Sequence, residues 1–346
     1  MNRRIIVVLV IIAIIVVGVF VFNLSSNNPV ANLLNKTADI DDLTGEMEKE
    51  PYALSIESLR QGDYPGSELV VEQTLTPGSN YSRYIVSYKT EGLKNYALLT
   101  VPNGEAPIGG WPAIVFNHGF IPPAEYRTTE RYIAYTDAFS RNGYILLRPD
   151  YRGHGNSEGE AAGGYGSNAY TIDVLNALAS LKKYPNVNIE KIGMWGHSMG
   201  GHITLRSMVV NKDIKAGVIW AGVVASYPDL INNWRRGTPR PTMPGARRSW
   251  RASLTEQFGT HENNPDFWNS ISSDYFLADV SGPIQLHHGT ADSSVPVEFS
   301  RKLEEKMKTA GKTVEYYEYS GDDHDITANF GIAAQRSVEF FDKYLK

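Results

Sequence analysis

A serine between two glycines at fixed spacing is the feature of this sequence best suited to chemistry. The segment Gly196-His197-Ser198-Met199-Gly200 has the Gly-x-Ser-x-Gly pattern of a tight turn that presents a serine hydroxyl. Residues 191–195 predict a short buried strand before the turn, and residues 202–210 predict a helix after it. A strand and a helix that meet in such a turn require small residues on both sides of the serine. The pattern therefore predicts that Ser198 is a nucleophile.

A serine nucleophile needs a base and an acid, and the chain supplies both after the serine. An unactivated hydroxyl reacts weakly at neutral pH, so Ser198 requires a histidine that accepts its proton. Of the 8 histidines, His324 lies in the predicted loop between the last strand and the last helix. Asp292 follows the preceding strand and is expected to accept the Nδ1 proton of His324. The three aspartates beside His324 are alternatives for the acid, but carboxylates so near in sequence rarely point back at the ring.

The developing negative charge on a substrate oxygen requires hydrogen-bond donors that are already in place. The backbone amide of Met199, directly after the serine, is expected to be one donor. The segment Asn117-His118-Gly119-Phe120 follows a predicted strand and resembles the His-Gly element of lipases and esterases. We therefore expect the backbone amide of Phe120 to be the second donor.

Composition excludes several other kinds of site. The 346 residues include no cysteine, which excludes disulfides, thiolate nucleophiles and cysteine metal sites. The net charge of -5 gives no indication of a nucleic-acid partner. The segment 261–265 has the first histidine and the glutamate of a zinc motif but lacks its second histidine, so we expect no metal and no cofactor.

The amino-terminal residues predict a membrane anchor over residues 1–22. Arg3 and Arg4 precede the uncharged apolar run from Ile5 to Phe22, which as a helix spans roughly 27 Å and can just cross a bilayer. Positive charges before the run favour a single-pass orientation with the carboxyl-terminal domain outside the cytoplasm. A cleaved signal peptide, which would make the protein secreted, is the alternative.

The remaining chain divides into a polar tether and one large domain. Residues 23–67 are polar and weakly patterned and are expected to be the tether, whereas residues 68–346 form the catalytic domain. Its first strands, 69–75, 81–88 and 96–101, predict antiparallel hairpins. Short apolar strands then alternate with helices, which predicts an α/β fold whose central sheet is mostly parallel with helices on both faces.

An insertion at about residues 226–280 interrupts this alternation. It contains three tryptophans and a cluster of arginines, and insertions of this length in compact domains are usually lids or binding loops. A solvated surface excursion is the alternative. Arg235 and Arg236 are the candidate substrate-binding residues, since they would pair with a carboxylate on the substrate.

Four segments together resemble the α/β-hydrolase superfamily, and within it the catalytic domain of prolyl-oligopeptidase-like serine peptidases. They are residues 117–120, 150–157, 196–201 and 288–296, and the resemblance covers about residues 68–346. It implies an α/β-hydrolase fold and an acyl-enzyme mechanism. Two features differ from the larger peptidases. Fewer than 50 residues separate the predicted anchor from the first predicted strand, so we expect no propeller domain between them, and residues 114–119 lack the tyrosine that some members use as an oxyanion donor. Acylaminoacyl-peptidase-like and esterase members carry His-Gly at this place.

We therefore expect a serine hydrolase that cleaves a small ester or a short peptide, with a prolyl-oligopeptidase-like peptidase as the leading interpretation. A carboxylesterase of the same fold is the alternative. A non-catalytic adhesion or scaffold protein is a third, and the presence of Ser198, Asp292 and His324 argues against it.

Overall fold

The structure, a computed structural model, describes residues 51–234 and 249–346. The predicted anchor, the tether up to residue 50, Arg235 and Arg236 lie outside the described residues. Among the residues that are described, no helix is long and apolar enough to cross a membrane.

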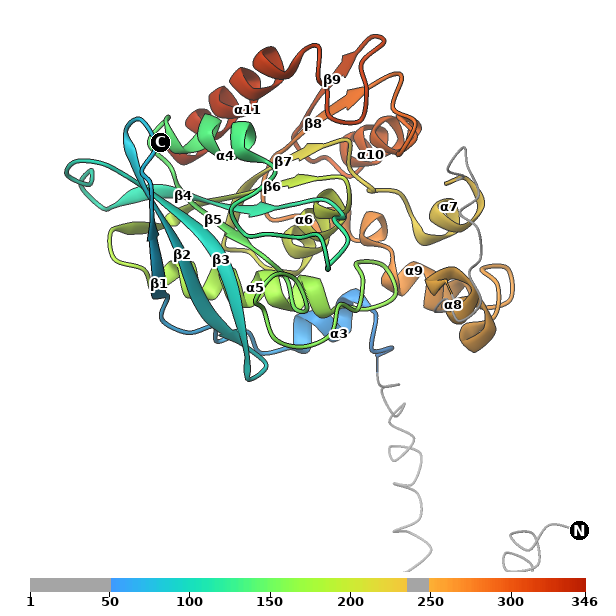
Figure 1. Ribbon diagram of the computed structural model, residues 1–346. Helices are drawn as coiled ribbons and strands as arrows, with labels where there is room; N and C mark the ends of the chain where they lie inside the picture. Colours follow the sequence, from blue (N-terminus) through green and yellow to red (C-terminus); the bar gives the residue numbers. More distant parts are fainter. Residues whose placement is uncertain (1–50, 235–248) are drawn as a thin grey trace, which may run out of the picture. The chain divides into compact units, whose positions relative to one another are not determined.

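A nine-stranded sheet forms the centre of the domain, in the order β1-β2-β3-β5-β4-β6-β7-β8-β9 (Figure 1). The strands are β1 Val70–Leu75, β2 Tyr81–Thr90, β3 Leu93–Pro102, β4 Trp111–Asn117, β5 Ile145–Pro149, β6 Val187–His197, β7 Ile214–Trp220, β8 Ile284–Gly289 and β9 Val314–Tyr319. The first three strands and β5 pair antiparallel, whereas β5, β4 and β6 to β9 pair in parallel. This confirms the predicted sheet, in which hairpins precede a parallel α/β region.

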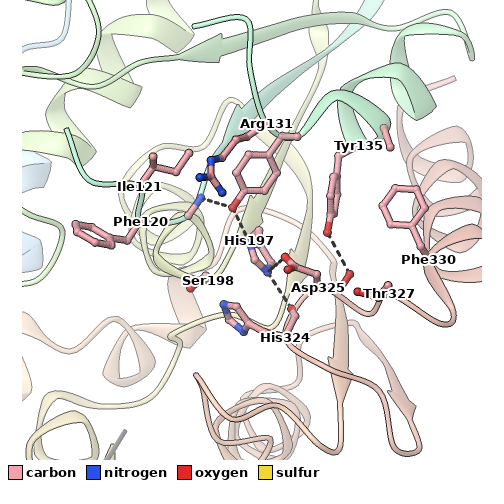
Figure 2. A pocket seen from close by; sticks show the side chains of 13 residues that line it. Phe120, Ile121, Arg131, Tyr135, His197, Ser198, His324, Asp325, Thr327 and Phe330 are labelled. Atoms are coloured by element: carbon pink, nitrogen blue, oxygen red, sulfur yellow. Dashed lines mark hydrogen bonds and ion pairs between the residues drawn. The ribbon is translucent and has the colours of Figure 1, made fainter. Parts of the chain in front are cut away.

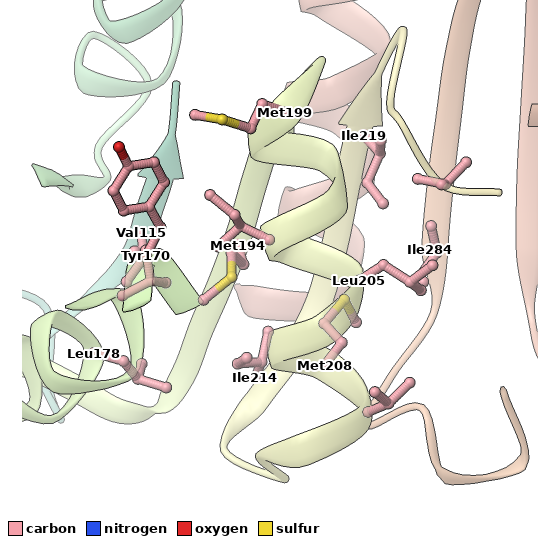
Figure 3. Packing of buried hydrophobic residues seen from close by; sticks show 14 of the residues in the cluster. Val115, Tyr170, Leu178, Met194, Met199, Leu205, Met208, Ile214, Ile219 and Ile284 are labelled. Carbon is pink, nitrogen blue, oxygen red and sulfur yellow. The ribbon is translucent and has the colours of Figure 1, made fainter. Parts of the chain in front are cut away.

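Helices cover both faces of the sheet, because successive strand residues point to opposite sides. In β6, Met194 belongs to the core cluster beneath α5 (Ala169–Lys182), α6 (Met199–Val210) and α10 (Glu298–Thr309), as Figure 3 shows for α6. The next residue, Trp195, packs in the second cluster with α4 (Ile133–Ser140) and α11 (Phe330–Leu345). Buried strands that are apolar on both faces are typical of a parallel sheet between two helical layers.

The compact unit begins at Pro51, earlier than the predicted start at Glu68. Helix α3 (Ile56–Gln61) is capped by the side chain of Ser55, and its Ile56 and Leu59 are buried. The fully buried Arg206 guanidinium of α6 donates hydrogen bonds to the carbonyls of Leu54 and Ile271 at 2.7 and 2.6 Å. The predicted tether, residues 23–67, is therefore too long at its carboxyl end, because long-range contacts hold a segment with a weak local pattern.

The insertion between β7 and β8 is helical where the structure describes it. It contains α7 (Tyr227–Asn232), α8 (Trp250–Phe258) and α9 (Pro265–Ile271), followed by the short turns Ser273–Tyr275 and Leu277–Asp279. These helices bury Phe267 and Trp268 in a small cluster of their own that includes Leu54. The insertion therefore packs partly on the amino-terminal segment of the domain.

The carboxyl ends of the parallel strands bring the candidate site residues to one edge of the sheet. Phe120 follows β4, Ser198 follows β6, Asp292 follows β8 and His324 follows β9. Residues far apart in sequence meet there because parallel strands end at the same edge.

Candidate active site

Ser198 occupies the tight turn between β6 and α6. Its backbone angles, φ 55° and ψ -117°, lie in a region that non-glycine residues rarely adopt, which costs about 1–3 kcal/mol. Three backbone hydrogen bonds hold it there: the Ser198 amide donates to Trp220 at 3.0 Å, and its carbonyl accepts from Gly201 and Val223 at 3.0 Å. The strain is thus held by the surrounding sheet and helix.

The two glycines of the motif allow the elements to touch. A Cβ at Gly200 would overlap the carbonyl of Asn117 at the end of β4, and one at Gly196 would overlap the carbonyl of Gly200. Glycine is required at both positions because the neighbouring atoms are backbone, which cannot rotate away. The predicted need for small residues around Ser198 therefore has a direct steric cause.

His324 and Asp292 lie in hydrogen-bond contact. The Nδ1 atom of His324 is 2.7 Å from Oδ2 of Asp292, so an ionised carboxylate fixes the proton on Nδ1 and leaves Nε2 as the free acceptor. The other carboxylate oxygen of Asp292 accepts from the amides of Ser294 and Val295 at 2.7 and 2.9 Å. The side chain of Asp292 is fully buried, whereas that of His324 is 22 % exposed.

A second histidine, His288, contacts the same carboxylate. Its Nε2 lies 3.1 Å from Oδ2 of Asp292 and 3.1 Å from the carbonyl of Val295, and its Nδ1 lies 2.7 Å from the Ser300 hydroxyl. Burial raises the pKa of Asp292, but hydrogen bonds from His288 and His324 lower it more, so that this pKa lies well below its usual range. Asp292 is therefore ionised at neutral pH. This contact of His288 was not predicted, although His288 stands only four residues before Asp292 in the sequence.

The three aspartates beside His324 make other contacts. Asp322 accepts from the amides of Ala328 and Asn329 and caps the approach to α11, and Asp323 accepts from the amide and hydroxyl of Thr327. Asp325 is exposed, with its carboxylate 3.6 Å from Nε2 of His197. The imidazole of His324 hydrogen-bonds to Asp292 instead.

The two amides expected to bind an oxyanion lie on either side of Ser198. Met199 is the first residue of α6, and a Cβ built at Gly119, next to Phe120, would lie 3.2 Å from the Cβ of Ser198. Among the described residues, the amides of Phe120 and Met199 have no hydrogen-bond acceptor. Both donors are thus available to a ligand beside Ser198.

A pocket of about 630 Å³ opens in front of Ser198 and His324 (Figure 2). Tyr132, Tyr135 and Phe330 form an aromatic wall, with ring centroids 5.3 Å apart for the tyrosine pair and 4.7 Å for Tyr135 and Phe330. The lining also includes one cation and one carboxylate and part of the loop after β4; these residues are Arg131, Asp325, Gly119, Phe120 and Ile121. Within the described part of the chain, no residue of the insertion lines this pocket, so its lid role remains a prediction.

The steric role of Gly200 predicts a severe effect of Gly200→Ala. The added methyl group would push α6 away from β4, and we expect a loss of at least about 3 kcal/mol in unfolding free energy together with loss of the turn. Gly331→Ala in α11 is the matched control, because a Cβ there meets no atom within 4 Å. That control should stabilise the protein by about 0.5–1 kcal/mol. Urea denaturation of both variants measures the difference, and similar stabilities would contradict the steric account.

Comparison with known proteins finds similarity to a peptidase family and to two curated proteins. Residues 112–274 match the family model described as serine aminopeptidase, S33. The chain is 26% identical to the uncharacterized peptidase YtmA of Bacillus subtilis over 71% of this chain and 87% of that protein. It is 25% identical to the protein ABHD12B of Homo sapiens over 60% of this chain and 52% of that protein.

Solved structures share the fold at lower sequence identity. The acylaminoacyl peptidase of Pyrococcus horikoshii superposes with a TM-score of 0.62 at 22% identity, covering 78% of this chain but only 42% of that chain. The Pyrococcus furiosus esterase Pf2001 superposes with a TM-score of 0.57 at 21% identity, covering 81% of this chain and 100% of that one. The chain thus matches less than half of that larger peptidase and the whole of the esterase. The sheet, the Ser198 turn and these matches show that the chain has an α/β-hydrolase fold, and residues 112–274 are similar to the serine aminopeptidase family.

Proposed function

We propose that this chain hydrolyses a peptide or amide bond with Ser198 as nucleophile, His324 as base and Asp292 as the acid that orients the base. The observation that carries the proposal is the 2.7 Å contact between His324 and the buried Asp292, in a pocket that His324 shares with the strained Ser198. A filled set of serine, histidine and acid also argues against the non-catalytic scaffold.

The reaction proceeds in two acyl transfers. The Ser198 hydroxyl gives its proton to Nε2 of His324 while its oxygen attacks the substrate carbonyl, and the amides of Phe120 and Met199 donate to the resulting oxyanion. The bond to the leaving group then breaks, and His324 returns the proton to that group. Water next attacks the acyl group on Ser198, again with His324 as base, which releases the acid and restores the serine.

The aromatic wall of Tyr132, Tyr135 and Phe330 favours an apolar group on the substrate. Contact with these rings would remove apolar surface from water and orient the scissile bond at Ser198. The serine aminopeptidase model and the peptidase relatives support a short peptide substrate. The esterase that this chain covers in full supports a small ester as the second candidate.

Replacement of Ser198 and Asp292 tests the assigned roles. Ser198→Ala should lower kcat about 10⁵- to 10⁶-fold, since no nucleophile remains. Asp292→Asn should lower kcat about 10⁴-fold, because an amide favours the wrong tautomer of His324. Labelling by a fluorophosphonate probe should occur in the wild type and fail in Ser198→Ala. Normal turnover of a correctly folded Ser198→Ala protein would overturn the proposal.

A matched pair of substrates separates peptidase from esterase. We expect an aminoacyl anilide and the p-nitrophenyl ester of the same acyl group both to be cleaved, with each activity lost in Ser198→Ala. Initial rates over a range of substrate concentrations give kcat/KM for both bonds. Ester cleavage without any anilide cleavage would replace the peptidase with the carboxylesterase.

We also propose that the apolar run Ile5 to Phe22 anchors the hydrolase in a membrane with its domain outside the cytoplasm. Support comes from the uncharged length of the run and from Arg3 and Arg4 before it. The full-length protein should remain in the membrane pellet after an alkaline wash. The double variant Ile12→Lys, Ile15→Lys should not, because each central lysine costs about 2.5–3.5 kcal/mol on insertion. A wild-type protein found soluble outside the cell without these residues would instead indicate a cleaved signal peptide.

A further inference from the structure

A chain of hydrogen bonds runs behind Ser198 from the loop after β4 to the loop after β9. The hydroxyl of Tyr132 accepts from the amide of Gly119 at 2.9 Å and lies 2.7 Å from Nδ1 of His197. The other nitrogen of the His197 imidazole, Nε2, lies 3.0 Å from the carbonyl oxygen of His324 (Figure 2). His197 thus contacts both loops that carry candidate catalytic groups.

The direction of every hydrogen bond in this chain follows from the partners. A carbonyl oxygen only accepts, so Nε2 of His197 carries the proton that it donates to His324. Burial lowers the pKa of His197 to about 3, and the ring is therefore neutral, with Nδ1 as an acceptor. Burial also keeps the pKa of Tyr132 above its ordinary value, so its hydroxyl retains the proton and donates it to Nδ1.

Tyr132 lies in a turn with a strained backbone, and a buried arginine holds that turn in place. Arg131 and Tyr132 have φ angles of 51° and 50°, in the left-handed region that ordinary residues rarely occupy. The guanidinium of Arg148, which is 1% exposed, donates to the carbonyls of Arg131 and Glu130 at 2.8 and 3.2 Å and also to that of Thr128. A buried cation thus fixes the turn that presents the tyrosine.

The segment after β5 completes this support. Asp150, fully buried, accepts from the hydroxyls of Tyr126 and Thr128, with the Tyr126 contact at 2.8 Å. Residues 150–157 are one of the four segments that resemble the α/β-hydrolase superfamily. Their position beneath residues 126–132 connects them to the site through Tyr132.

We propose that Tyr132 and His197 are positioning residues that set the oxyanion donor of Phe120 and the base His324 in fixed places on either side of Ser198. The inference rests on the proposed function. The peptide group of Phe120 begins at Gly119, so a fixed Gly119 amide limits the rotation of the next amide. The His324 carbonyl belongs to the residue whose ring must meet Ser198. These hydrogen bonds, the Tyr132–His197 bridge, therefore hold two groups that act together in the transition state: the amide of Phe120 and the imidazole of His324.

Loss of the bridge should affect the transition state more than substrate binding. The oxyanion forms only as the reaction proceeds, so a displaced Phe120 amide lowers kcat with little change in KM. Small misplacements of reacting groups lower rates by about 10²-fold. We therefore expect kcat to fall about 10- to 100-fold, with KM within about threefold of the wild type.

Three variants interrupt the bridge at defined points. Tyr132→Phe keeps the ring in the aromatic wall but removes the hydroxyl. His197→Gln retains a donor near the position of Nε2, and His197→Asn retains an acceptor near the position of Nδ1. Tyr144→Phe is the matched control, since it removes a buried tyrosine hydroxyl that donates to Asp342 at 2.6 Å, away from the pocket.

The experiment measures kcat, KM, melting temperature and the rate of fluorophosphonate labelling at Ser198 for each variant and for Tyr132→Phe combined with His197→Gln. We expect the double variant to lose no more activity than the worse single variant, because each breaks the same bridge. Tyr144→Phe should keep wild-type kcat at a comparable melting temperature. If Tyr132→Phe does not fold, the two His197 variants test the bridge from its other end.

The outcomes separate this inference from the proposed function. Wild-type kcat in folded Tyr132→Phe, or independent multiplicative losses in the double variant, would overturn the bridge while Ser198 labelling remains. The bridge would also be overturned if Tyr132→Phe and Tyr144→Phe lost kcat to the same extent, each in proportion to its fall in melting temperature. Failure of the wild-type protein to label at Ser198 would overturn the proposed function, and the inference with it.

Discussion

The close contact of α6 with the end of β4 is the constraint on which the site depends. Gly200 lies against the carbonyl of Asn117, so the helix that follows Ser198 and the strand that leads to Phe120 touch without side chains between them. That contact supports the strained conformation of Ser198 and brings the loop that contains Phe120 close to Ser198 and Met199. A larger residue at Gly200 would separate these parts at once.

The order of strands in the sheet determines where the other candidate site residues lie around Ser198. The strand β6 leads to Ser198 and lies between β4, which leads to Phe120, and β7, beyond which β8 and β9 lead to Asp292 and His324. The candidate acid and base therefore lie on one side of β6 and the loop that contains Phe120 lies on the other. A buried Asp292, ionised and hydrogen-bonded to two histidines and two amides, lies ready to stabilise a charged His324.

Local sequence was sufficient to predict the features whose cause is local. The turn at Ser198 requires glycines at a fixed spacing, and short apolar strands alternating with helices specify a parallel sheet, so both could be predicted. Asp292 and His324 could be predicted because each lies in a loop directly after a predicted strand, and both follow Ser198 in the chain. In contrast, Tyr132 joins the site only through folded contacts, and no local pattern distinguishes it from other buried residues. His288 stands four residues before Asp292, but its residue type and spacing alone do not indicate that its ring shares the carboxylate with His324. The residues of helix α3 were assigned to the tether for the same reason. Arg206 holds the segment before this helix by donating to the carbonyl of Leu54, 152 residues earlier in the sequence.

A crystal structure of the protein with a covalently bound phosphonate would show whether Ser198 is the nucleophile and whether the amides of Phe120 and Met199 bind the oxyanion, because a phosphonate resembles the tetrahedral intermediate. We expect phosphorus bonded to Oγ of Ser198, with one phosphonyl oxygen about 3 Å from the amides of Phe120 and Met199. His324 should keep its Nδ1 contact with Asp292 and direct Nε2 toward the Ser198 oxygen. A phosphonate on another residue, or an oxygen turned away from both amides, would contradict the account.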